Sequence, residues 1–408
     1  WRICAIIQLL LSLRQAYGWY GRPQYVGHGR ANTIISTPTR SKIWLKAMSV
    51  PTEVNSSFES AEQCSEVIDV RSPSEFAIDH FPGAINLPVL DDNERHTIGC
   101  LYKENSFDAK KQGAALVARN IAKHLDAHLS GKTGEYKPLV YCWRGGSRSQ
   151  SMALTLTQIG WRVNILEGGY KTYREEVIAM NERIPPTLQI RVLAGLTGVG
   201  KTALLMHLRS LGHQVVDLEG LANHRGSALG SSGLGAQPSQ KMFESRVAVE
   251  LKRCDPSRPV WVEAESSKVG NVGVPSGLWK RMRGAPRLFV TLPIEVRVER
   301  ILDDYHYWLQ NPLELKAALE RLRNRHGAKT LERWNGLIDA GSWHELVESL
   351  LLEHYDALYK HKEDEHSEVP AATVHLLDFS AEQLSIFVDQ ATATYPTQLE
   401  YPTTADGN

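Results

Sequence analysis

The feature that most restricts the fold of this chain is the segment Gly195 to Thr202, which reads GLTGVGKT and fits the pattern G-x-x-x-x-G-K-[ST]. An apolar run, Leu188 to Leu193, precedes it, and an amphipathic helical pattern follows it. A strand before such a segment and a helix after it distinguish a phosphate-binding loop from a chance cluster of glycines. The loop amides surround a phosphate, the lysine neutralises its charge and the threonine hydroxyl can ligate a metal ion. We therefore expect phosphate to be bound by Gly195, Gly198, Gly200, Lys201 and Thr202.

A second strand–loop–helix pattern surrounds Cys142. The apolar run from Pro138 to Tyr141 leads into C-W-R-G-G-S-R-S, and a helical pattern follows. The glycines let successive amides point inward, and the helix N-terminus adds its positive end, so the loop stabilises a thiolate and holds an anion beside it. The alternative is a buried structural cysteine, but packing requires no guanidiniums there, so we interpret Cys142 as a nucleophile that carries a chalcogen. The expected anion cradle consists of Arg144, Gly145, Gly146, Ser147 and Arg148.

Length and composition indicate a soluble protein of two domains. A chain of 408 residues is long for one hydrophobic core. Its formal net charge is zero, so any contact with nucleic acid must come from local basic patches. The five cysteines lack C-x-x-C spacing, which argues against a zinc site or a disulfide framework and favours a reducing compartment. No apolar stretch reaches the roughly 20 residues of a membrane helix, so we expect no membrane contact.

Residues 1–52 contain basic but no acidic side chains. Such a segment resembles an organelle transit peptide. The alternative is upstream sequence translated in error, with Met48 as the true start, and we adopt this interpretation. We therefore predict that residues 1–52 are a basic extension, disordered or not native, and that the protein is cytoplasmic unless the extension directs it to an organelle.

Strands and helices alternate along the rest of the chain, which predicts parallel sheets covered by helices. The prolines at 185 and 186 indicate a linker. We expect a first domain over residues 60–178 and a second over residues 187–395, whose C-terminal part is helical. Residues 396–408 are expected to be a disordered tail.

Charged side chains follow several predicted strands of the second domain. Because ligands bind beyond the carboxyl ends of parallel strands, we expect these side chains to border the phosphate loop, with a solvated polar loop as the alternative. Glu263 and Glu265 share one face of their strand, so spacing leaves open which of them orients a metal ion. The glycine- and serine-rich segment 226–239 is a candidate lid or substrate loop. The supporting residues predicted here are Asp217, Glu219, His224, Arg225, Glu263, Glu265, Arg297 and Arg300.

Two further features have less specific interpretations. A basic run between Arg321 and Arg333 either meets RNA phosphates or forms a solvated helix face. Cys100 is either a second functional thiol or a packed residue; because it lacks a glycine-rich loop, we expect it to be packed.

Three strings in the first domain resemble a rhodanese domain over about residues 60–178. They are D-V-R-x-x-x-E-F-x-x-x-H-x-P-G-A-I-N from Asp69, C-x-R-G-G-x-R-S from Cys142 and L-E-G-G-Y from Leu166. The resemblance implies that Cys142 takes up sulfur or selenium as a persulfide-type adduct. The fold class expected is α/β, with a rhodanese-like parallel-sheet domain followed by a P-loop NTPase-like α/β domain with a helical C-terminal part.

The pairing of these two domains resembles the tRNA 2-selenouridine synthase family. The strings D-L-E-G-L-A-x-H-R-G-S from Asp217 and E-x-E-S from Glu263 add to the likeness, which covers nearly everything after Met48. It implies that the wobble 2-thiouridine of tRNA is geranylated by geranyl diphosphate and then selenated by selenophosphate, with an S-selanyl adduct at Cys142. It further implies no tightly bound cofactor, Mg²⁺ as a candidate metal ion and a selenophosphate-supplying enzyme as a candidate partner.

Three rival interpretations remain open. A rhodanese-type sulfurtransferase with an ATP-using second domain would transfer sulfur and turn over ATP without tRNA. A nucleotide-gated binding module with a degenerate first domain is disfavoured, because the thiol, the loop arginines and Lys201 are all present. A nucleoside or sugar kinase would leave the cysteine loop without a role.

Overall fold

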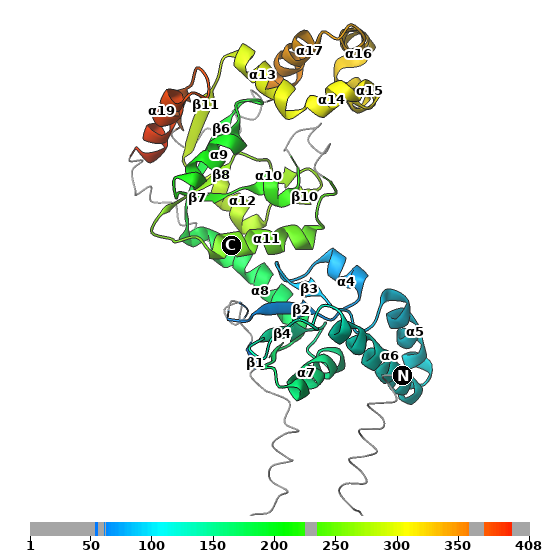
Figure 1. Cartoon of the computed structure of the whole chain (residues 1–408). Helices are drawn as coiled ribbons and strands as arrows, with labels where there is room; N and C mark the ends of the chain where they lie inside the picture. The colour runs from blue at the N-terminus through cyan, green and yellow to red at the C-terminus, as the bar shows by residue number, and fades with distance from the viewer. Residues whose placement is uncertain (1–53, 56–60, 62, 225–234, 359–370, 394–408) are drawn as a thin grey trace, which may run out of the picture. The chain divides into compact units, whose positions relative to one another are not determined.

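The computed structural model describes residues 54–55, 61, 63–224, 235–358 and 371–393 (Figure 1). All of them belong to one compact unit that begins at Val50. The predictions for the extension 1–52 and for the tail 396–408 lie outside the described residues. Arg225 and most of the candidate lid, residues 226–234, also lie outside them.

The first sheet contains five parallel strands in the order β1-β5-β4-β2-β3. β4 lies at its centre, and its carboxyl end leads directly into the cysteine loop. The strands span Val54–Asn55 (β1), Glu66–Asp69 (β2), Ile85–Asn86 (β3), Pro138–Tyr141 (β4) and Asn164–Leu166 (β5).

Helices pack on both faces of this sheet. One face buries Met152 and Leu156 of α7 against the strands, and the other buries Tyr173 and Val177 of α8. A capping box at Asp91 begins α5, a helix that the sequence patterns did not predict. The helices span Pro73–Ile78 (α4), Asp92–Glu104 (α5), Ser106–Asp126 (α6), Ser147–Ile159 (α7) and Gly169–Arg183 (α8).

The second sheet also has five parallel strands, in the order β12-β11-β6-β8-β7. β6 lies at its centre and ends in the phosphate loop. A short antiparallel pair, Lys268–Val269 (β9) and Val272–Gly273 (β10), lies outside the sheet. The sheet strands span Gln189–Gly195 (β6), Gln214–Val216 (β7), Pro259–Glu263 (β8), Arg287–Thr291 (β11) and Ala371–His375 (β12).

Two apolar cores cover the faces of the second sheet. Leu205 of α9 and Phe387 of α19 belong to one core, while Phe243 of α11 and Leu278 of α12 belong to the other. The helices span Lys201–Ser210 (α9), Leu218–Ala222 (α10), Gln240–Lys252 (α11), Ser276–Arg283 (α12) and Ala381–Thr392 (α19). The predicted α/β fold class with parallel sheets is thus confirmed.

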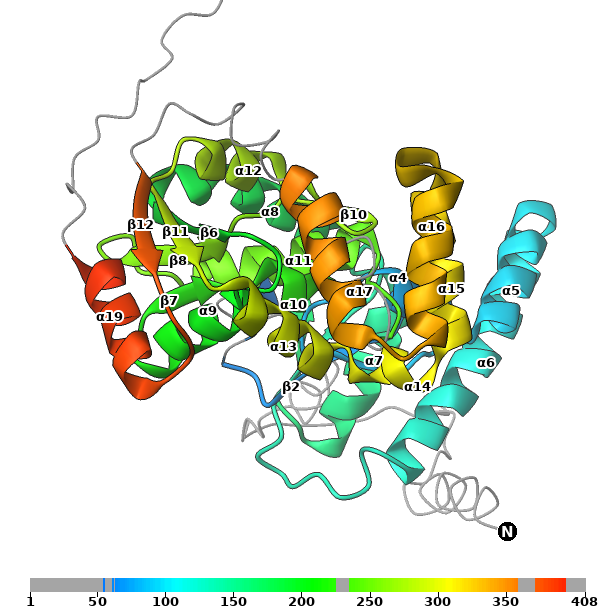
Figure 2. The same cartoon turned by 90° about the horizontal axis from the view of Figure 1, so that it is seen from above.

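A helical extension follows β11, with its own apolar core around Trp334 (Figure 2). Gly327 has a φ of 74° and bends α16 near its start. The helices span Ile294–Asp304 (α13), His306–Gln310 (α14), Pro312–Leu319 (α15), Arg323–Asp339 (α16) and Trp343–Leu350 (α17), and a π-helical turn, Leu351–Tyr355 (η3), continues α17. No helix among the described residues is both long and apolar enough to span a membrane.

A buried polar cluster links α8 to α11. Asp79 is fully buried and accepts hydrogen bonds from the hydroxyls of Tyr170 (2.8 Å) and Ser245 (2.8 Å). The guanidinium of Arg174 pairs with Glu244 and also lies 3.9 Å from the Asp79 carboxylate. Both carboxylate oxygens of Asp79 are therefore satisfied inside the protein, as a buried charge requires.

We expect Asp79→Ala to reduce the free energy of unfolding by about 2–4 kcal/mol, because the Tyr170 and Ser245 hydroxyls would remain buried without this acceptor. Urea unfolding followed by circular dichroism measures the loss. The control is Asp126→Ala, which removes an exposed carboxylate at the end of α6. Equal stability of the two variants would show that the cluster does not stabilise the fold.

Candidate active site

The cysteine loop lies between β4 and α7 and buries the Cys142 side chain to 3% exposure. One side of this side chain belongs to the apolar core of the first domain. The Ser149 hydroxyl lies 3.2 Å from the sulfur, and the Gly146 carbonyl oxygen lies 3.8 Å from it. Ser149 is itself buried, and its one hydroxyl proton can go either to the sulfur or to the Gly146 carbonyl, 3.1 Å from the hydroxyl oxygen. A thiolate is the stronger acceptor of the two. Ser149 was not among the predicted cradle residues, although its position on the first turn of the predicted helix was available as a signal.

A second glycine-rich segment supports the cysteine loop from behind. The amide of Tyr170 donates to the Cys142 carbonyl at 2.8 Å, and the amide of Lys171 donates to the Trp143 carbonyl at 3.0 Å. Gly169 has a φ of 63°, and a Cβ there would lie 2.3 Å from the Cys142 carbonyl oxygen. Gly145 also has a positive φ, and a Cβ would lie 3.2 Å from the Leu166 carbonyl oxygen. The loop can therefore adopt this shape only with glycines at its contact points.

The two loop arginines have different surroundings. Arg144 is exposed, whereas Arg148 is half-buried and donates to Glu75 at 2.9 Å. Burial raises the pKa of Glu75, but the guanidiniums of Arg148 and Arg95 outweigh it and leave the pKa below its usual range. Arg148 thus anchors α7 to α4, and the binding of an anion by the cradle residues stays a prediction.

The phosphate loop connects β6 to α9. Gly200 precedes α9 with a φ of 72°, and a Cβ there would lie 2.7 Å from a guanidinium nitrogen of Arg300. The Lys201 ammonium donates to the Gly195 carbonyl at 3.0 Å, and the Thr202 hydroxyl donates to Glu219 at 2.9 Å. The loop therefore has the shape of an anion cradle, with its cation and its hydroxyl held at the same edge of the sheet.

Glu263 lies beside Glu219, the residue that accepts the Thr202 hydroxyl. Glu263 ends β8, is fully buried, and accepts the Glu219 amide at 2.6 Å. Burial raises the pKa of Glu263 well above its usual range, and the charges of Asp217 and Glu219 raise it further. Glu265 lies half-exposed just beyond the strand.

The expected metal ion is not supported by a ligand cluster. No group of three or more potential metal ligands occurs among the described residues. The raised pKa of Glu263 also disfavours the ionised carboxylate that a metal ion binds. Mg²⁺ therefore stays a prediction, with Thr202 and Glu219 as the paired oxygens closest to the loop.

His224 is buried just after α10, and its burial lowers the pKa of the imidazole although Glu219 opposes the shift. It lies in the sequence string that begins at Asp217 and thus near the carboxylates. Arg225, which was predicted to act beside it, lies outside the described residues.

Helix α13 brings both of its predicted arginines to the phosphate loop. Arg297 is 3% exposed, donates to the Thr197 carbonyl at 2.8 Å, and forms two hydrogen bonds to Asp356 at 2.6 and 3.0 Å. Its guanidinium is therefore occupied in holding the loop. Arg300 instead stacks on the Phe379 ring at 3.9 Å beside Gly200. No sequence pattern indicated Asp356 or Phe379, which lie far downstream.

The structure bears on the alternatives left open for Cys100 and for the basic run between Arg321 and Arg333. Cys100, expected to be packed, is exposed, with its sulfur 3.7 Å from the His96 imidazole; this expectation was wrong because α5 turns that face to solvent. In the basic run, Arg323 pairs with Glu320 and Arg333 pairs with Glu353 on helix surfaces. The ion pairs favour the solvated-face interpretation for these two arginines. The other basic side chains of the run are exposed, namely Arg321, Arg325 and Lys329.

Comparisons with known proteins match both parts of the chain. A family model described as "tRNA 2-selenouridine synthase AAA domain" matches residues 188–376, and one described as "Rhodanese-like domain" matches residues 50–176. A relative named "tRNA 2-selenouridine synthase" from Pseudomonas savastanoi pv. phaseolicola is 33% identical over 353 residues, or 78% of this chain and 94% of that relative. One of the same name from Chromohalobacter salexigens is 34% identical, over 77% of this chain and 92% of the relative.

Among solved structures, one titled "Crystal structure of N-terminal domain of putative ATP/GTP binding protein from Clostridium difficile 630" is 36% identical to this chain. The match covers 29% of this chain and 95% of the solved chain, with a TM-score of 0.27. It adds nothing to the description of the fold. The two family matches confirm the resemblances inferred from the sequence motifs.

Gly169→Ala should destabilise the protein more than Gly160→Ala. Both glycines have a positive φ, but a Cβ at 160 meets nothing within 4 Å, whereas one at 169 meets the cysteine loop. We expect about 1 kcal/mol for the backbone strain alone at 160 and at least about 2 kcal/mol more at 169. Urea unfolding measures both losses, and the rate of Cys142 alkylation by iodoacetamide reports the loop. Equal losses with unchanged alkylation would contradict the close contact.

The stability of the Glu263→Gln variant should increase relative to that of the wild type as the pH rises. The pKa of Glu263 is raised in the folded protein, so the folded state binds its proton more tightly than the unfolded state does. The stabilisation that this proton provides is complete below the unfolded pKa of about 4.3 and is lost as the pH rises towards the folded pKa. Glutamine keeps the acceptor for the Glu219 amide and has no proton to lose. We expect the wild type minus variant difference in the free energy of unfolding to fall between pH 5 and pH 8. A pH-independent difference would show that Glu263 is ionised in the folded protein.

Proposed function

Because the chain belongs to the tRNA 2-selenouridine synthase family, we propose that it converts 2-thiouridine at the wobble position of tRNA to 2-selenouridine in two transfer steps. The observation that carries this proposal is the presence, in one chain, of a cysteine whose sulfur lies 3.2 Å from the Ser149 hydroxyl in a glycine-containing loop, and of a phosphate loop whose lysine lies against it. The first site suits chalcogen chemistry, and the second suits a diphosphate leaving group.

In the first step, the sulfur of 2-thiouridine attacks C1 of geranyl diphosphate. A C–S bond forms, the C–O bond to the diphosphate breaks, and diphosphate leaves with the electron pair while the base loses its N3 proton. The loop amides, Lys201 and Arg300 would stabilise the charge that develops on the leaving group. Lys201 needs only to exchange the Gly195 carbonyl, 3.0 Å away, for a phosphate oxygen.

In the second step, selenium replaces the geranyl-bound sulfur. The selenium of selenophosphate becomes bonded to C2 of the base, water takes up the phosphoryl group as phosphate, and geranylthiol leaves with a proton. We propose that Cys142 holds the selenium as an S-selanyl adduct: its S–Se bond forms as a disulfide takes up two electrons and becomes two thiols, and two thiols return these electrons when selenide leaves for C2. The Ser149 hydroxyl, 3.2 Å from the sulfur, stabilises the thiolate before and after this exchange. The proposal includes the expectations of a separate selenophosphate-supplying enzyme and of no tightly bound cofactor.

The protein is further proposed to work in the reducing cytoplasm. The chemistry requires a free thiol at Cys142, and Cys142 forms no disulfide.

Mass spectrometry of nucleosides tests the two steps separately. Thiolated tRNA is incubated with the protein, geranyl diphosphate and selenophosphate, and each donor is omitted in turn. We expect S-geranyl-2-thiouridine to accumulate without selenophosphate and no selenouridine to form without geranyl diphosphate. Turnover of ATP and transfer of sulfur in the absence of tRNA would instead support the sulfurtransferase alternative.

Single substitutions should separate the two sites. Lys201→Ala should slow geranylation by about 100-fold or more, because the leaving diphosphate loses its counter-charge. Cys142→Ser should retain geranylation and lose selenation, whereas the control Cys100→Ser should retain both. Normal selenation by Cys142→Ser would remove the proposed role of the cysteine, and normal geranylation by Lys201→Ala would remove that of the phosphate loop.

A further inference from the structure

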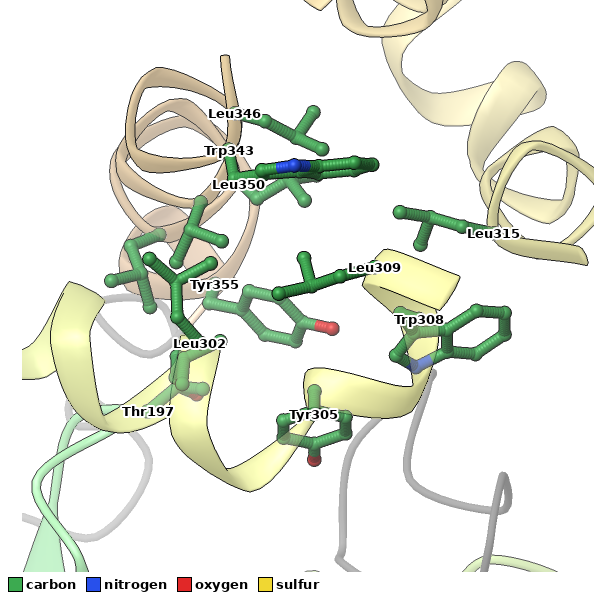
Figure 3. A pocket seen from close by; sticks show the side chains of 13 residues that line it. Thr197, Leu302, Tyr305, Trp308, Leu309, Leu315, Trp343, Leu346, Leu350 and Tyr355 are labelled. Carbon is green, nitrogen blue, oxygen red and sulfur yellow. The ribbon is translucent and has the colours of Figure 1, made fainter. Parts of the chain in front are cut away.

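An apolar pocket opens between the phosphate loop and the helical extension (Figure 3). Its cavity volume of about 70 Å³ is several times the space that one water molecule requires. Apart from Thr197 and the polar atoms of tyrosine and tryptophan rings, the lining is hydrocarbon. The lining residues include Thr197, Ile301, Leu309, Trp343, Leu351 and Tyr355.

The pocket walls come from several helices of the extension. Ile301 lies on α13, Leu309 on α14 and Trp343 on α17. The π-helical turn η3 contributes Leu351 and Tyr355, and such turns are frequent at functional sites. Figure 3 shows Leu309, Trp343 and Tyr355 directed into the same hollow from different helices. Rigid aromatic rings and a leucine on separate elements are typical of a binding pocket for an apolar group.

The same pocket is physically joined to the phosphate loop. Thr197 lines the pocket and lies within the loop, and its carbonyl accepts the Arg297 guanidinium at 2.8 Å. A Cβ at Gly198 would lie 3.1 Å from Ile301, so α13 is in close contact with the loop. An anion bound by the loop would therefore lie close to Thr197, which lines the apolar cavity.

We propose that this pocket binds the hydrocarbon chain of an isoprenoid diphosphate whose phosphates occupy the loop. The inference rests on the proposed function, and it assigns the residues that select the alkyl donor. A nucleotide fits the lining poorly, because a ribose and a base need several hydrogen-bond partners and the lining offers few. A branched chain of ten carbons instead gains from every methylene that leaves water.

Binding measurements without tRNA test the pocket independently of catalysis. Isothermal titration calorimetry compares geranyl diphosphate, dimethylallyl diphosphate and pyrophosphate. We expect the wild type to bind geranyl diphosphate at least about tenfold more tightly than dimethylallyl diphosphate, since five further carbons are buried. Equal affinity for the three compounds would overturn the proposal.

Substitutions at Leu309 and Leu313 form a matched pair. Leu309 lines the pocket, whereas Leu313 lies four residues along the chain, is 81% exposed and does not line it. Leu309→Trp should weaken the binding of geranyl diphosphate at least about tenfold, because the larger side chain fills the cavity. The affinity for pyrophosphate should change less than about twofold, because the loop stays intact. Leu313→Trp should change neither. Leu309→Ala enlarges the pocket and should shift the preference towards farnesyl diphosphate.

These results and those on catalysis separate two kinds of failure. If the wild type binds geranyl diphosphate through its chain but forms no S-geranyl nucleoside, the pocket stands and the proposed function falls. If geranyl transfer occurs and Leu309→Trp binds and transfers geranyl normally, the pocket assignment falls and the proposed function stands. Equal losses of affinity for geranyl diphosphate and for pyrophosphate in Leu309→Trp would also overturn the pocket assignment, because they would indicate damage to the loop.

Discussion

The guanidinium of Arg297 joins the phosphate loop to the helical extension. It is almost fully buried, and it binds the Thr197 carbonyl on one side and both oxygens of Asp356 on the other. A buried ion pair offsets its own desolvation only when its geometry is good, so its main effect is to fix positions rather than to add stability. Because Asp356 directly follows η3, the loop, the apolar pocket and the last helical turn are held in one arrangement.

The cysteine loop is fixed by a different interaction, between backbone and backbone. The amides at the start of α8 bind the carbonyls of Cys142 and Trp143, and Gly169 makes the approach possible. Behind them, Arg71 pairs with Asp69 at 2.6 Å and lies 3.9 Å from the centre of the Tyr170 ring. Each loop is thus held in place by a second segment that binds its backbone carbonyls.

The carboxylates near the phosphate loop show how neighbouring acids divide their roles. Glu219 accepts the Thr202 hydroxyl, while burial, with the neighbouring charges second, raises the pKa of Glu263. A raised pKa disfavours a second negative charge beside the loop, which favours the approach of an anionic ligand. Residue type alone did not distinguish them, because the two positions carry the same side chain.

The sequence by itself determined both loops and the α/β class, because each loop is a local strand–glycine–helix pattern whose meaning depends on adjacent residues. It also identified Lys201, Thr202 and Cys142 by their positions in those patterns. The partner of Arg297, the stacking of Arg300 on Phe379 and the exposure of Cys100 were decided only by the tertiary structure. The apolar pocket belongs to the same group, since its walls come from helices whose leucines and aromatics each read as ordinary core residues. Contacts between distant segments depend on how helices pack, and spacing along the chain does not encode that packing.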